Sequence, residues 1–246
     1  MDVFYEDTYQ VNTGDVDLFG HCRPSAVLRF LQEAAIQGGI ALGVSRDEVI
    51  HRYHAFWMLS RIRYELKRPL YGEENVTIKT WHRGGKGAVM YREFDLGVGA
   101  EQVGQALSIW VLADLDTHKL LRMSGVTELE ASRGGSLCRG DVLHKLRKPE
   151  GLLLAERRKL HYSETDINGH VNNVRYADFA CDALGLERLG QGKFVSSLQL
   201  CYLQECLPGE ELELFTGIDG QNCYISGRGL EKKERFDALL TLDKLS

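Results

Sequence analysis

One short stretch of the chain carries side chains at alternate positions that suit acid–base chemistry. Asp166, Asn168 and His170 supply a carboxylate, a carboxamide and an imidazole. A helix-like pattern follows directly, and Asn172 or Asn173 can cap it, so that the first N–H groups of the helix point toward these side chains. An acid–base set beside a helix N-terminus suits reactions in which negative charge develops on a carbonyl oxygen. The stretch therefore predicts acyl transfer or hydrolysis.

The same spacing of residue types occurs a second time, closer to the N-terminus. Residues 17–21 (DLFGH) match residues 166–170 (DINGH) at an offset of 149. Two further pairs of segments match at an offset of 137, namely 57–60 with 194–197 and 72–74 with 209–211. The shared order predicts an internal duplication. The first copy then has 12 extra residues, the difference between the offsets, and the capping-box pattern of Ser45 and Glu48 predicts a short helix within them.

The elements that would position these residues follow one order in both copies. Pro24 suits the first position of a helix, because Val27, Leu28 and Leu31 follow it at helical spacing. Strands are predicted in the first copy at 2–12, 57–67, 76–83, 88–97 and 103–115. The second copy has a predicted strand at 156–163, a helix at 172–184, and strands at 194–205, 211–219, 222–230 and 235–243. One helix with a run of antiparallel strands indicates a curved sheet wrapping each helix, which is the α+β class.

The composition narrows the class of protein. Of the 246 residues, 43% are hydrophobic and 26% are charged, as in ordinary globular proteins. No apolar run approaches the roughly 20 residues of a membrane span, and the net charge of −5 argues against a nucleic-acid partner. The N-terminus lacks a signal-peptide core, and the six scattered cysteines contain no C-x-x-C. We therefore expect a cytoplasmic protein with reduced thiols and neither a membrane nor a nucleic-acid partner.

With these elements placed, the chain resembles the acyl-ACP thioesterase family over nearly its whole length. In the second half the resemblance rests on D-x-N-x-H-V-N-N-V-x-Y at 166–176 and on Y-x-x-E-C at 202–206. In the first half it rests on W-x-x-S-R at 57–61, K-T-W at 79–81, S-x-W-V at 108–111 and T-x-x-L-x-R-M at 117–123.

The resemblance implies a fold of two tandem hotdog domains. Residues 1–125 would form an N-terminal hotdog that shapes the acyl pocket, residues 126–150 a connecting segment, and residues 151–246 the catalytic C-terminal hotdog. The implied activity is hydrolysis of acyl-ACP to free fatty acid and acyl carrier protein (ACP), which ends chain elongation. Since two tandem hotdogs already supply a dimer-like unit, a monomer or a homodimer is expected.

The resemblance also implies a catalytic set of Asp166, Asn168, His170 and Glu205. We expect water to attack the thioester carbonyl, with Glu205 as general base and with Asp166 and His170 orienting the water. Asn168 and backbone N–H groups near Val171 would stabilise the oxyanion, and each such donor contributes about 3–4 kcal/mol at the transition state. How Asp166 and Glu205 divide the work stays open.

Two further residues have both a functional and a structural interpretation. Cys206 could be a nucleophile with His170 as its base, or a small buried residue beside Glu205, and we favour the second. Trp57 begins the strand after the first helix and is the candidate for lining the acyl pocket, whereas tryptophan more commonly packs in a core.

The first copy lacks part of the catalytic set. At the offset of 149 it has Phe19 in place of Asn168, and at the offset of 137 it has Arg68 in place of Glu205. A phenylalanine cannot donate a hydrogen bond to an oxyanion, and an arginine cannot act as a base near neutral pH. We therefore expect the first copy to be catalytically silent and the chain to have one active site.

Neither a metal nor another cofactor is expected. Residues 164–169 resemble the start of a calcium loop, but the twelfth position holds Arg175 instead of a bidentate glutamate. The histidines form no H-E-x-x-H, and the cysteines form no ligand pairs. Two basic clusters, residues 145–148 and 157–159, could converge into a docking surface for the acidic carrier protein.

Three alternative functions are compatible with the same scaffold. An acyl-CoA thioesterase would need contacts to nucleotide phosphates, and no Gly-rich phosphate loop is present. A non-catalytic acyl-binding hotdog regulator would need neither Asn168 nor Glu205, and no segment is left for a helix-turn-helix. A hotdog dehydratase would not account for the Glu205-Cys206 pair or the full-length duplication.

Overall fold

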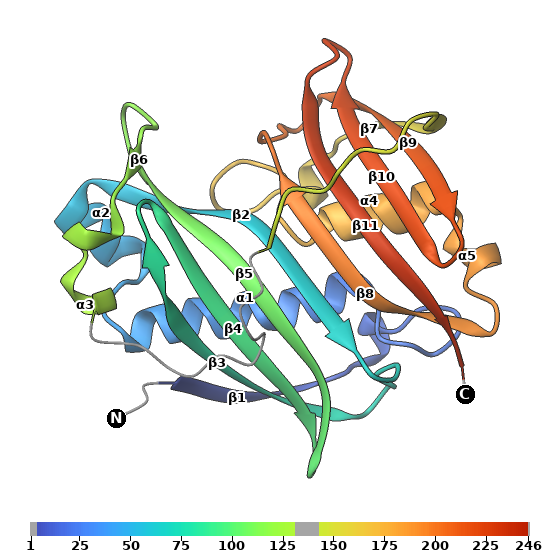
Figure 1. Ribbon diagram of the computed structural model, residues 1–246, viewed down its shortest axis with the longest axis horizontal. Helices are drawn as coiled ribbons and strands as arrows, with labels where there is room; N and C mark the ends of the chain where they lie inside the picture. Colours follow the sequence, from blue (N-terminus) through green and yellow to red (C-terminus); the bar gives the residue numbers. More distant parts are fainter. Residues whose placement is uncertain (1–3, 131–142, 246) are drawn as a thin grey trace. The chain divides into compact units, whose positions relative to one another are not determined.

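The structure is a computed structural model that describes residues 4–130 and 143–245 (Figure 1). Contacts divide the chain into two compact units, and each is described by itself. The first unit comprises Met1–Val11, Arg29–Tyr64 and Glu73–Leu143, and the second comprises Asn12–Leu28, Glu65–Gly72 and His144–Ser246. Each unit is built from three separate segments of the chain. The predicted division into 1–125, 126–150 and 151–246 instead cuts the chain into consecutive segments.

The first unit contains an antiparallel sheet and most of a long helix. The strand order is β1-β3-β4-β5-β2, and the two-residue β6 (Leu120–Leu121) pairs with β5. The bounds are β1 (Phe4–Gln10), β2 (Ala55–Leu66), β3 (Asn75–Lys86), β4 (Val89–Val98) and β5 (Glu101–Asp114). Helix α1 (Pro24–Ala41) begins at Pro24, as predicted. It lies against the sheet, because Phe30 stacks on Tyr9 of β1 with ring centroids 5.5 Å apart.

A second helix occupies the insertion predicted in the first copy. Helix α2 (Arg46–Tyr53) has Ser45 as its N-cap. The Glu48 N–H donates to Ser45 Oγ at 3.3 Å, and the Ser45 N–H donates to Glu48 Oε2 at 3.0 Å. These reciprocal bonds are the predicted capping box. Two short helices, η2 (Met123–Gly125) and α3 (Thr127–Glu130), follow the last strand of this unit.

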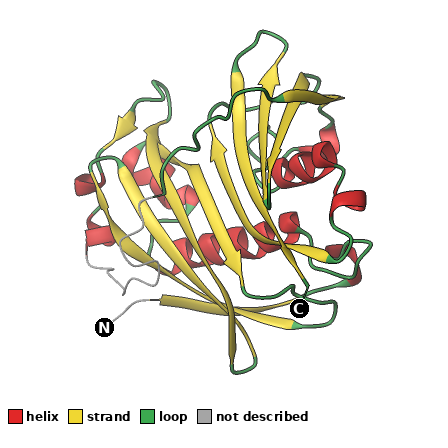
Figure 2. Cartoon of the chain, turned by 45° about the vertical axis from the view of Figure 1, so that its right-hand side comes forward, coloured by secondary structure: helices red, strands yellow, loops and turns green. Residues whose placement is uncertain are grey.

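The second unit repeats the arrangement with a shorter helix (Figure 2). Its antiparallel strands follow the order β8-β11-β10-β9-β7. The bounds are β7 (Leu153–Lys159), β8 (Lys193–Tyr202), β9 (Glu211–Asp219), β10 (Asn222–Gly229) and β11 (Glu234–Lys244). Helix α4 (Arg175–Leu184) packs against β7, β9, β10 and β11, and the short α5 (Leu186–Leu189) follows it. The predicted α+β class and its elements are confirmed.

The start of α4 differs from the prediction. Neither Asn172 nor Asn173 is the N-cap, which is Val174, and the apolar side chain of Val174 makes no capping hydrogen bond. Instead Asn172 Oδ1 accepts from the Val174 N–H at 3.0 Å, so the asparagine stabilises a turn ahead of the helix. None of the described helices is long and apolar enough to cross a membrane.

Main-chain hydrogen bonds confirm the duplication and correct its register. The Cys22 N–H donates to the Leu70 carbonyl at 2.7 Å, and the Val171 N–H donates to the Cys206 carbonyl at 2.9 Å. The donors are 149 residues apart, as predicted, but the acceptors are 136 apart instead of 137. The counterpart of Glu205 is therefore Pro69 and not Arg68. The short Gly-Glu-Glu match misled the alignment, because two adjacent glutamates pair almost equally well after a slip of one residue.

Candidate active site

A tight turn beyond the short helix η3 (Tyr162–Glu164) presents the predicted catalytic residues. Asp166 Oδ1 accepts from the Asn168 N–H at 2.8 Å. The Asp166 N–H donates to the His170 carbonyl at 3.0 Å, and the Gly169 N–H donates to the Asp166 carbonyl at 3.0 Å. Gly169 has a φ of 79°, a conformation that a residue with a Cβ rarely adopts. One oxygen of the half-buried Asp166 is thus committed to holding the turn.

Two of the predicted residues meet directly, from different loops. His170 Nε2 lies 3.3 Å from Glu205 Oε2, and their side chains are 34% and 42% exposed. Glu205 does not lie in a strand, as the predicted range 194–205 implied, because β8 ends at Tyr202. It lies instead in the loop to β9, which leaves its carboxylate open to solvent. The pair can therefore reach a water molecule and a substrate.

Asn168 lies at the exposed tip of the turn. Its N–H is bound to Asp166, while its carboxamide makes no hydrogen bond with any residue that the structure describes. The NH₂ group is thus available to donate to a ligand. The predicted set is brought together as a turn that carries Asp166, Asn168 and His170 and a facing loop that carries Glu205.

Cys206 is fully buried beneath this site. Burial raises the pKa of its thiol to about 11, although a hydrogen bond from Tyr176 and the charge of Arg235 act in the opposite direction. A thiol with this pKa is protonated at neutral pH and is a poor nucleophile. The geometry therefore favours the structural interpretation of Cys206.

Two residues that the sequence analysis did not assign a role hold the loops of the site. The Tyr202 hydroxyl donates to the Asn173 carbonyl at 3.0 Å, and Arg235 Nη1 donates to the Glu205 carbonyl at 2.7 Å. The Y-x-x-E-C motif at 202–206 already singled out Tyr202 in the sequence. No sequence motif pointed to Arg235, because Glu205 and Glu210, two of its partners, are 30 and 25 residues away.

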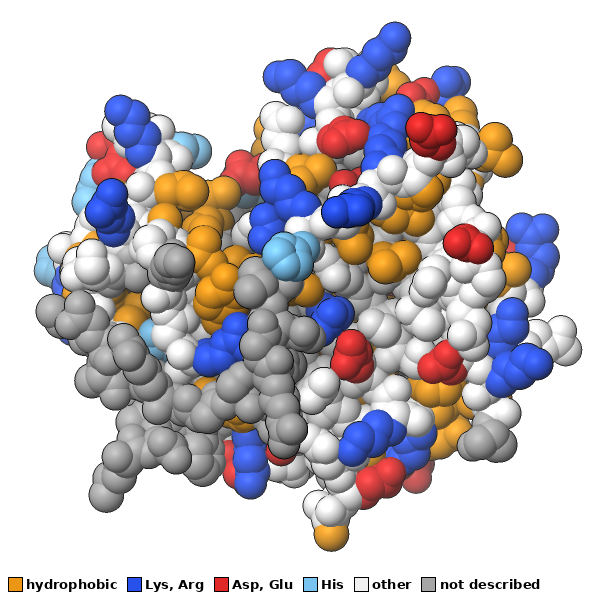
Figure 3. All heavy atoms as spheres, in the orientation of Figure 1, with side chains coloured by type: hydrophobic (Ala, Val, Ile, Leu, Met, Phe, Trp, Pro, Cys, Tyr) orange, Lys and Arg blue, Asp and Glu red, His pale blue; other side chains and the backbone are white. Residues whose placement is uncertain are grey.

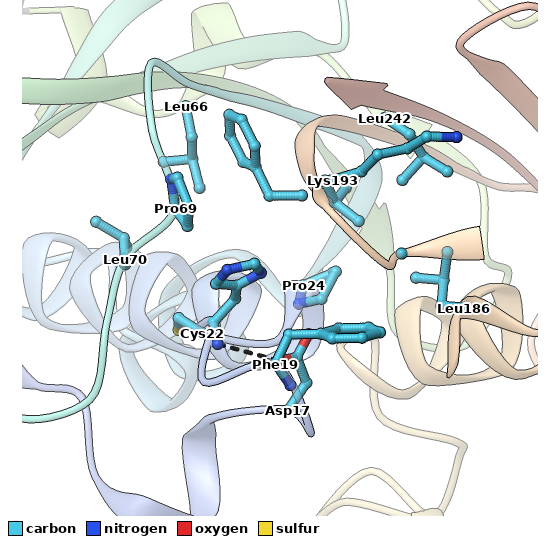
Figure 4. Close-up of a pocket in the computed structure, with 14 residues that line it drawn as sticks. Asp17, Phe19, Cys22, Pro24, Leu66, Pro69, Leu70, Leu186, Lys193 and Leu242 are labelled. Atoms are coloured by element: carbon cyan, nitrogen blue, oxygen red, sulfur yellow. Dashed lines mark hydrogen bonds between the residues drawn. The ribbon is translucent and has the colours of Figure 1, made fainter. Parts of the chain in front are cut away.

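The corresponding turn of the first copy keeps its main-chain frame. Asp17 Oδ1 accepts from the N–H groups of Phe19 and His21 at 2.9 and 3.0 Å. Figure 4 shows Pro69 and Leu70 across a pocket from Asp17 and Phe19. This pocket measures about 440 Å³, including the part open to solvent, and most of its lining is apolar. With Phe19 and Pro69 in the places of the amide and the second carboxylate, the turn lacks two of the four groups proposed for catalysis.

Trp57 packs in the core of the first unit. Its Nε1 donates to the Val44 carbonyl at 3.0 Å, and its ring contacts a buried cluster that includes Val49, Met90 and Leu112. Core packing thus accounts for this tryptophan, and its role in lining an acyl pocket stays a prediction.

Three of the six basic residues in the two predicted clusters form ion pairs. Lys148 pairs with Glu234 at 2.8 Å, and Arg157 pairs with Glu213 at 2.8 Å. Arg158 contacts several carboxylates and stacks over a phenylalanine ring. Figure 3 shows basic and acidic side chains interspersed over the right-hand half of the visible face. These pairs neutralise part of the positive charge at residues 145–148 and 157–159, and the role of the two clusters in docking stays a prediction.

Clusters of metal ligands are absent from the part of the chain that the structure describes. Within residues 4–130 and 143–245, no three His, Cys, Asp or Glu side chains are close enough to hold a metal ion. The site itself presents two carboxylates, an imidazole and a carboxamide.

Comparison with known proteins identifies relatives of both halves of the chain. The acyl-ACP thioesterase N-terminal domain matches residues 2–128, and the acyl-ACP thioesterase C-terminal domain matches residues 153–235. Oleoyl-acyl carrier protein thioesterase 2 of Arabidopsis thaliana is 22% identical over 90% of this chain and 65% of its own length. Acyl-[acyl-carrier-protein] hydrolase FATB2 of Cuphea viscosissima is 26% identical over 88% of this chain and 54% of its own. The chain thus spans between half and two-thirds of the length of these relatives.

Solved structures show the same fold. An acyl-ACP thioesterase from Bacteroides thetaiotaomicron superposes with a TM-score of 0.84 and 21% identity, and 98% of each chain is covered. The 12:0-ACP thioesterase from Umbellularia californica superposes with a TM-score of 0.85 and 17% identity, again over 98% of each chain. These likenesses establish the predicted hotdog fold. Because the two domain profiles of one family together span most of the sequence in the expected order, the chain belongs to the acyl-ACP thioesterase family.

Proposed function

We propose that this protein hydrolyses acyl-ACP and so releases a free fatty acid and ACP. The observation that carries the proposal is the 3.3 Å contact between His170 Nε2 and Glu205 Oε2. Both side chains are solvent-accessible, and the Asn168 carboxamide projects from the same turn. Relatives named as acyl-ACP thioesterases and hydrolases support the choice of substrate. In this role the protein would end chain elongation in fatty acid biosynthesis.

The proposed reaction begins with a water molecule that both Glu205 and His170 contact. The Glu205 carboxylate takes a proton from the water while the water oxygen bonds to the carbonyl carbon of the thioester. The Asn168 carboxamide donates to the oxyanion that forms. The tetrahedral intermediate then collapses, its C–S bond breaks, and the departing thiolate takes up the proton from Glu205. The products are the fatty acid and the free thiol of the carrier.

The contacts of Asp166 support a division of labour with Glu205. One Asp166 oxygen already accepts from the Asn168 N–H, so this carboxylate is suited to holding the turn that positions Asn168 and His170. Glu205 has a more exposed carboxylate and contacts the imidazole directly. We assign the general base to Glu205 and an orienting role to Asp166.

The test is release of free thiol by the purified protein from a panel of acyl-ACPs, with acyl-CoAs of the same chain lengths alongside. The expected result is rapid turnover of acyl-ACP, weak turnover of acyl-CoA, and loss of both in Glu205→Gln. Preferential turnover of CoA esters would favour the acyl-CoA thioesterase instead. Binding of acyl groups without hydrolysis of either ester would favour the acyl-binding regulator.

The remaining expectations about the protein's setting stay proposals. We propose ACP as the partner, without nucleic acid or membrane, and a monomer or homodimer as the assembly. A cytoplasmic location is supported by the cysteines, since Cys22, Cys181, Cys201, Cys206 and Cys223 are all free thiols.

A further inference from the structure

Arg235 lies buried directly beneath the loop that carries Glu205. It is the second residue of β11, and its side chain is only 8% exposed. Its own carbonyl accepts from the N–H groups of Leu203 and Gln204 at 2.9 and 3.1 Å. Its Nη1 donates to the carbonyl of Glu205 at 2.7 Å. Three consecutive residues of the loop are therefore bound to this one arginine.

The other end of the guanidinium holds the second half of the loop. Arg235 Nη2 contacts Glu231 Oε1 at 2.7 Å and Glu210 Oε1 at 3.2 Å. The second oxygen of Glu210 accepts from the Leu207 N–H at 3.1 Å. Arg235 thus ties residues 203–205 and residues 207–210 to one point. Removing the cation would leave two carboxylates close together without a counter-charge and would release the loop.

We propose that Arg235 is a positioning residue that sets the Glu205 carboxylate against His170. The inference rests on the proposed function, in which Glu205 is the general base. Arg235 contacts the carbonyl of Glu205 and not its carboxylate, so it acts on the backbone from which the base projects. A displacement of about 1 Å in a catalytic group can cost about 100-fold in rate, so small movements of this loop matter.

The geometry requires an arginine and not merely a cation. Nη1 donates to a carbonyl oxygen, and Nη2 donates to two carboxylates. Two nitrogens of one rigid plane thus bind partners that lie in different directions. A lysine has one ammonium on a flexible stem and cannot maintain both directions at once. Arg235→Lys should therefore keep the charge balance and the fold while it loosens the hold on Glu205.

The variants to compare are Arg235→Met, Arg235→Lys and the matched control Arg228→Met. Arg228 lies on the neighbouring strand β10 and stacks over Phe215 at 4.5 Å. Arg228 forms no hydrogen bond or ion pair with residues 203–210, all of which the structure describes, so its loss leaves the loop unaffected. We expect Arg235→Met to lower kcat by about 100-fold with KM changed by less than about two-fold. Arg235→Lys should show an intermediate kcat at nearly the wild-type melting temperature, and Arg228→Met should keep the wild-type kcat.

Combining these changes with Glu205→Gln separates this inference from the proposed function. If Arg235 acts through Glu205, adding Arg235→Met to Glu205→Gln lowers the residual rate by no more than about two-fold. If the losses in kcat of the two single variants multiply in the double variant, the positioning role is overturned. It is also overturned if Arg235→Lys and folded Arg235→Met both keep the wild-type kcat. Either result leaves the base assignment intact. Wild-type turnover by Glu205→Gln alone would overturn the base assignment itself. Should Arg235→Met fail to fold, Arg235→Lys carries the same comparison.

Discussion

The Val171 N–H donates to the Cys206 carbonyl oxygen at 2.9 Å, and this main-chain bond joins the two loops of the site. His170 precedes the donor by one residue, and Glu205 precedes the acceptor by one residue. The bond therefore fixes the backbone on which both side chains stand. Because main-chain atoms make the connection, it survives any side-chain substitution in the catalytic set. A lower kcat in such a variant therefore reports the loss of the chemical group and not a movement of the loops.

Replacing Glu205 by glutamine should nearly abolish turnover. The change keeps the size of the side chain but removes the group that accepts the proton from water, and general bases contribute about 100- to 10,000-fold. The measurement is kcat with the preferred acyl-ACP. Glu213→Gln is a suitable control, because this glutamate pairs with Arg157 at the surface of β9. Equal rates in the two variants would refute the role of Glu205.

Replacing Asn168 by alanine should lower kcat by about 100- to 1,000-fold with little change in KM, as expected for the loss of one donor to an oxyanion. The folded state should be nearly unaffected, because the Asn168 carboxamide has no partner among the described residues and its N–H remains. Steady-state kinetics and thermal unfolding on the same preparation check both statements. A rise in KM at constant kcat would indicate a role in substrate binding instead.

Cys206→Ala should retain substantial turnover and alter the response of stability to alkaline pH. Burial raises the pKa of the thiol from its ordinary value of 9.0 to about 11, so the folded state favours the protonated form. Folding of the wild type therefore loses stability as pH rises from about 9 to about 11, whereas the alanine variant lacks this loss. Urea unfolding of both proteins at pH 8 and pH 10.5 measures the difference. Loss of all turnover in Cys206→Ala would revive the nucleophile mechanism.

Asp17→Asn and Asp166→Asn form a matched pair that tests the silence of the first copy. Each asparagine keeps an oxygen that can accept the turn's N–H groups, so both variants should fold normally. We expect Asp17→Asn to keep kcat within about two-fold of the wild type and Asp166→Asn to lower kcat by at least about ten-fold. The reason is that only the Asp166 carboxylate orients a catalytic set. Comparable losses in the two variants would show that the first copy also contributes to turnover.

Local patterns in the sequence were sufficient for most of the fold. Pro24 marks the start of α1, and the pairing of Ser45 with Glu48 marks α2, because helix ends are decided by a few adjacent residues. The turn around Gly169 was likewise visible in its spacing. The prediction of the counterpart of Glu205 failed because it depended on the register of the two copies. A slip of one residue in the alignment gave Arg68, whereas the hydrogen bonds give Pro69.

Contacts between distant segments were beyond the reach of these patterns. Glu205 was expected within a strand, because the run of apolar residues from Leu200 to Leu203 gives no sign that the pairing of β8 with β11 ends at Tyr202. The sequence did not single out Arg235, because only the fold brings it to the Glu205 carbonyl and the Glu210 carboxylate. Nothing in the residues around Arg235 distinguishes it from a surface arginine.

The two turns can carry different residues, Asn168 and Glu205 in one and Phe19 and Pro69 in the other, because one chain encodes each of them separately. In an assembly of identical subunits, every substitution appears at each symmetry-related position, so a turn that must catalyse cannot also be released from catalysis. A chain that carries both turns is free of that coupling. A substitution in the first turn therefore leaves Asp166, Asn168, His170 and Glu205 in place in the second.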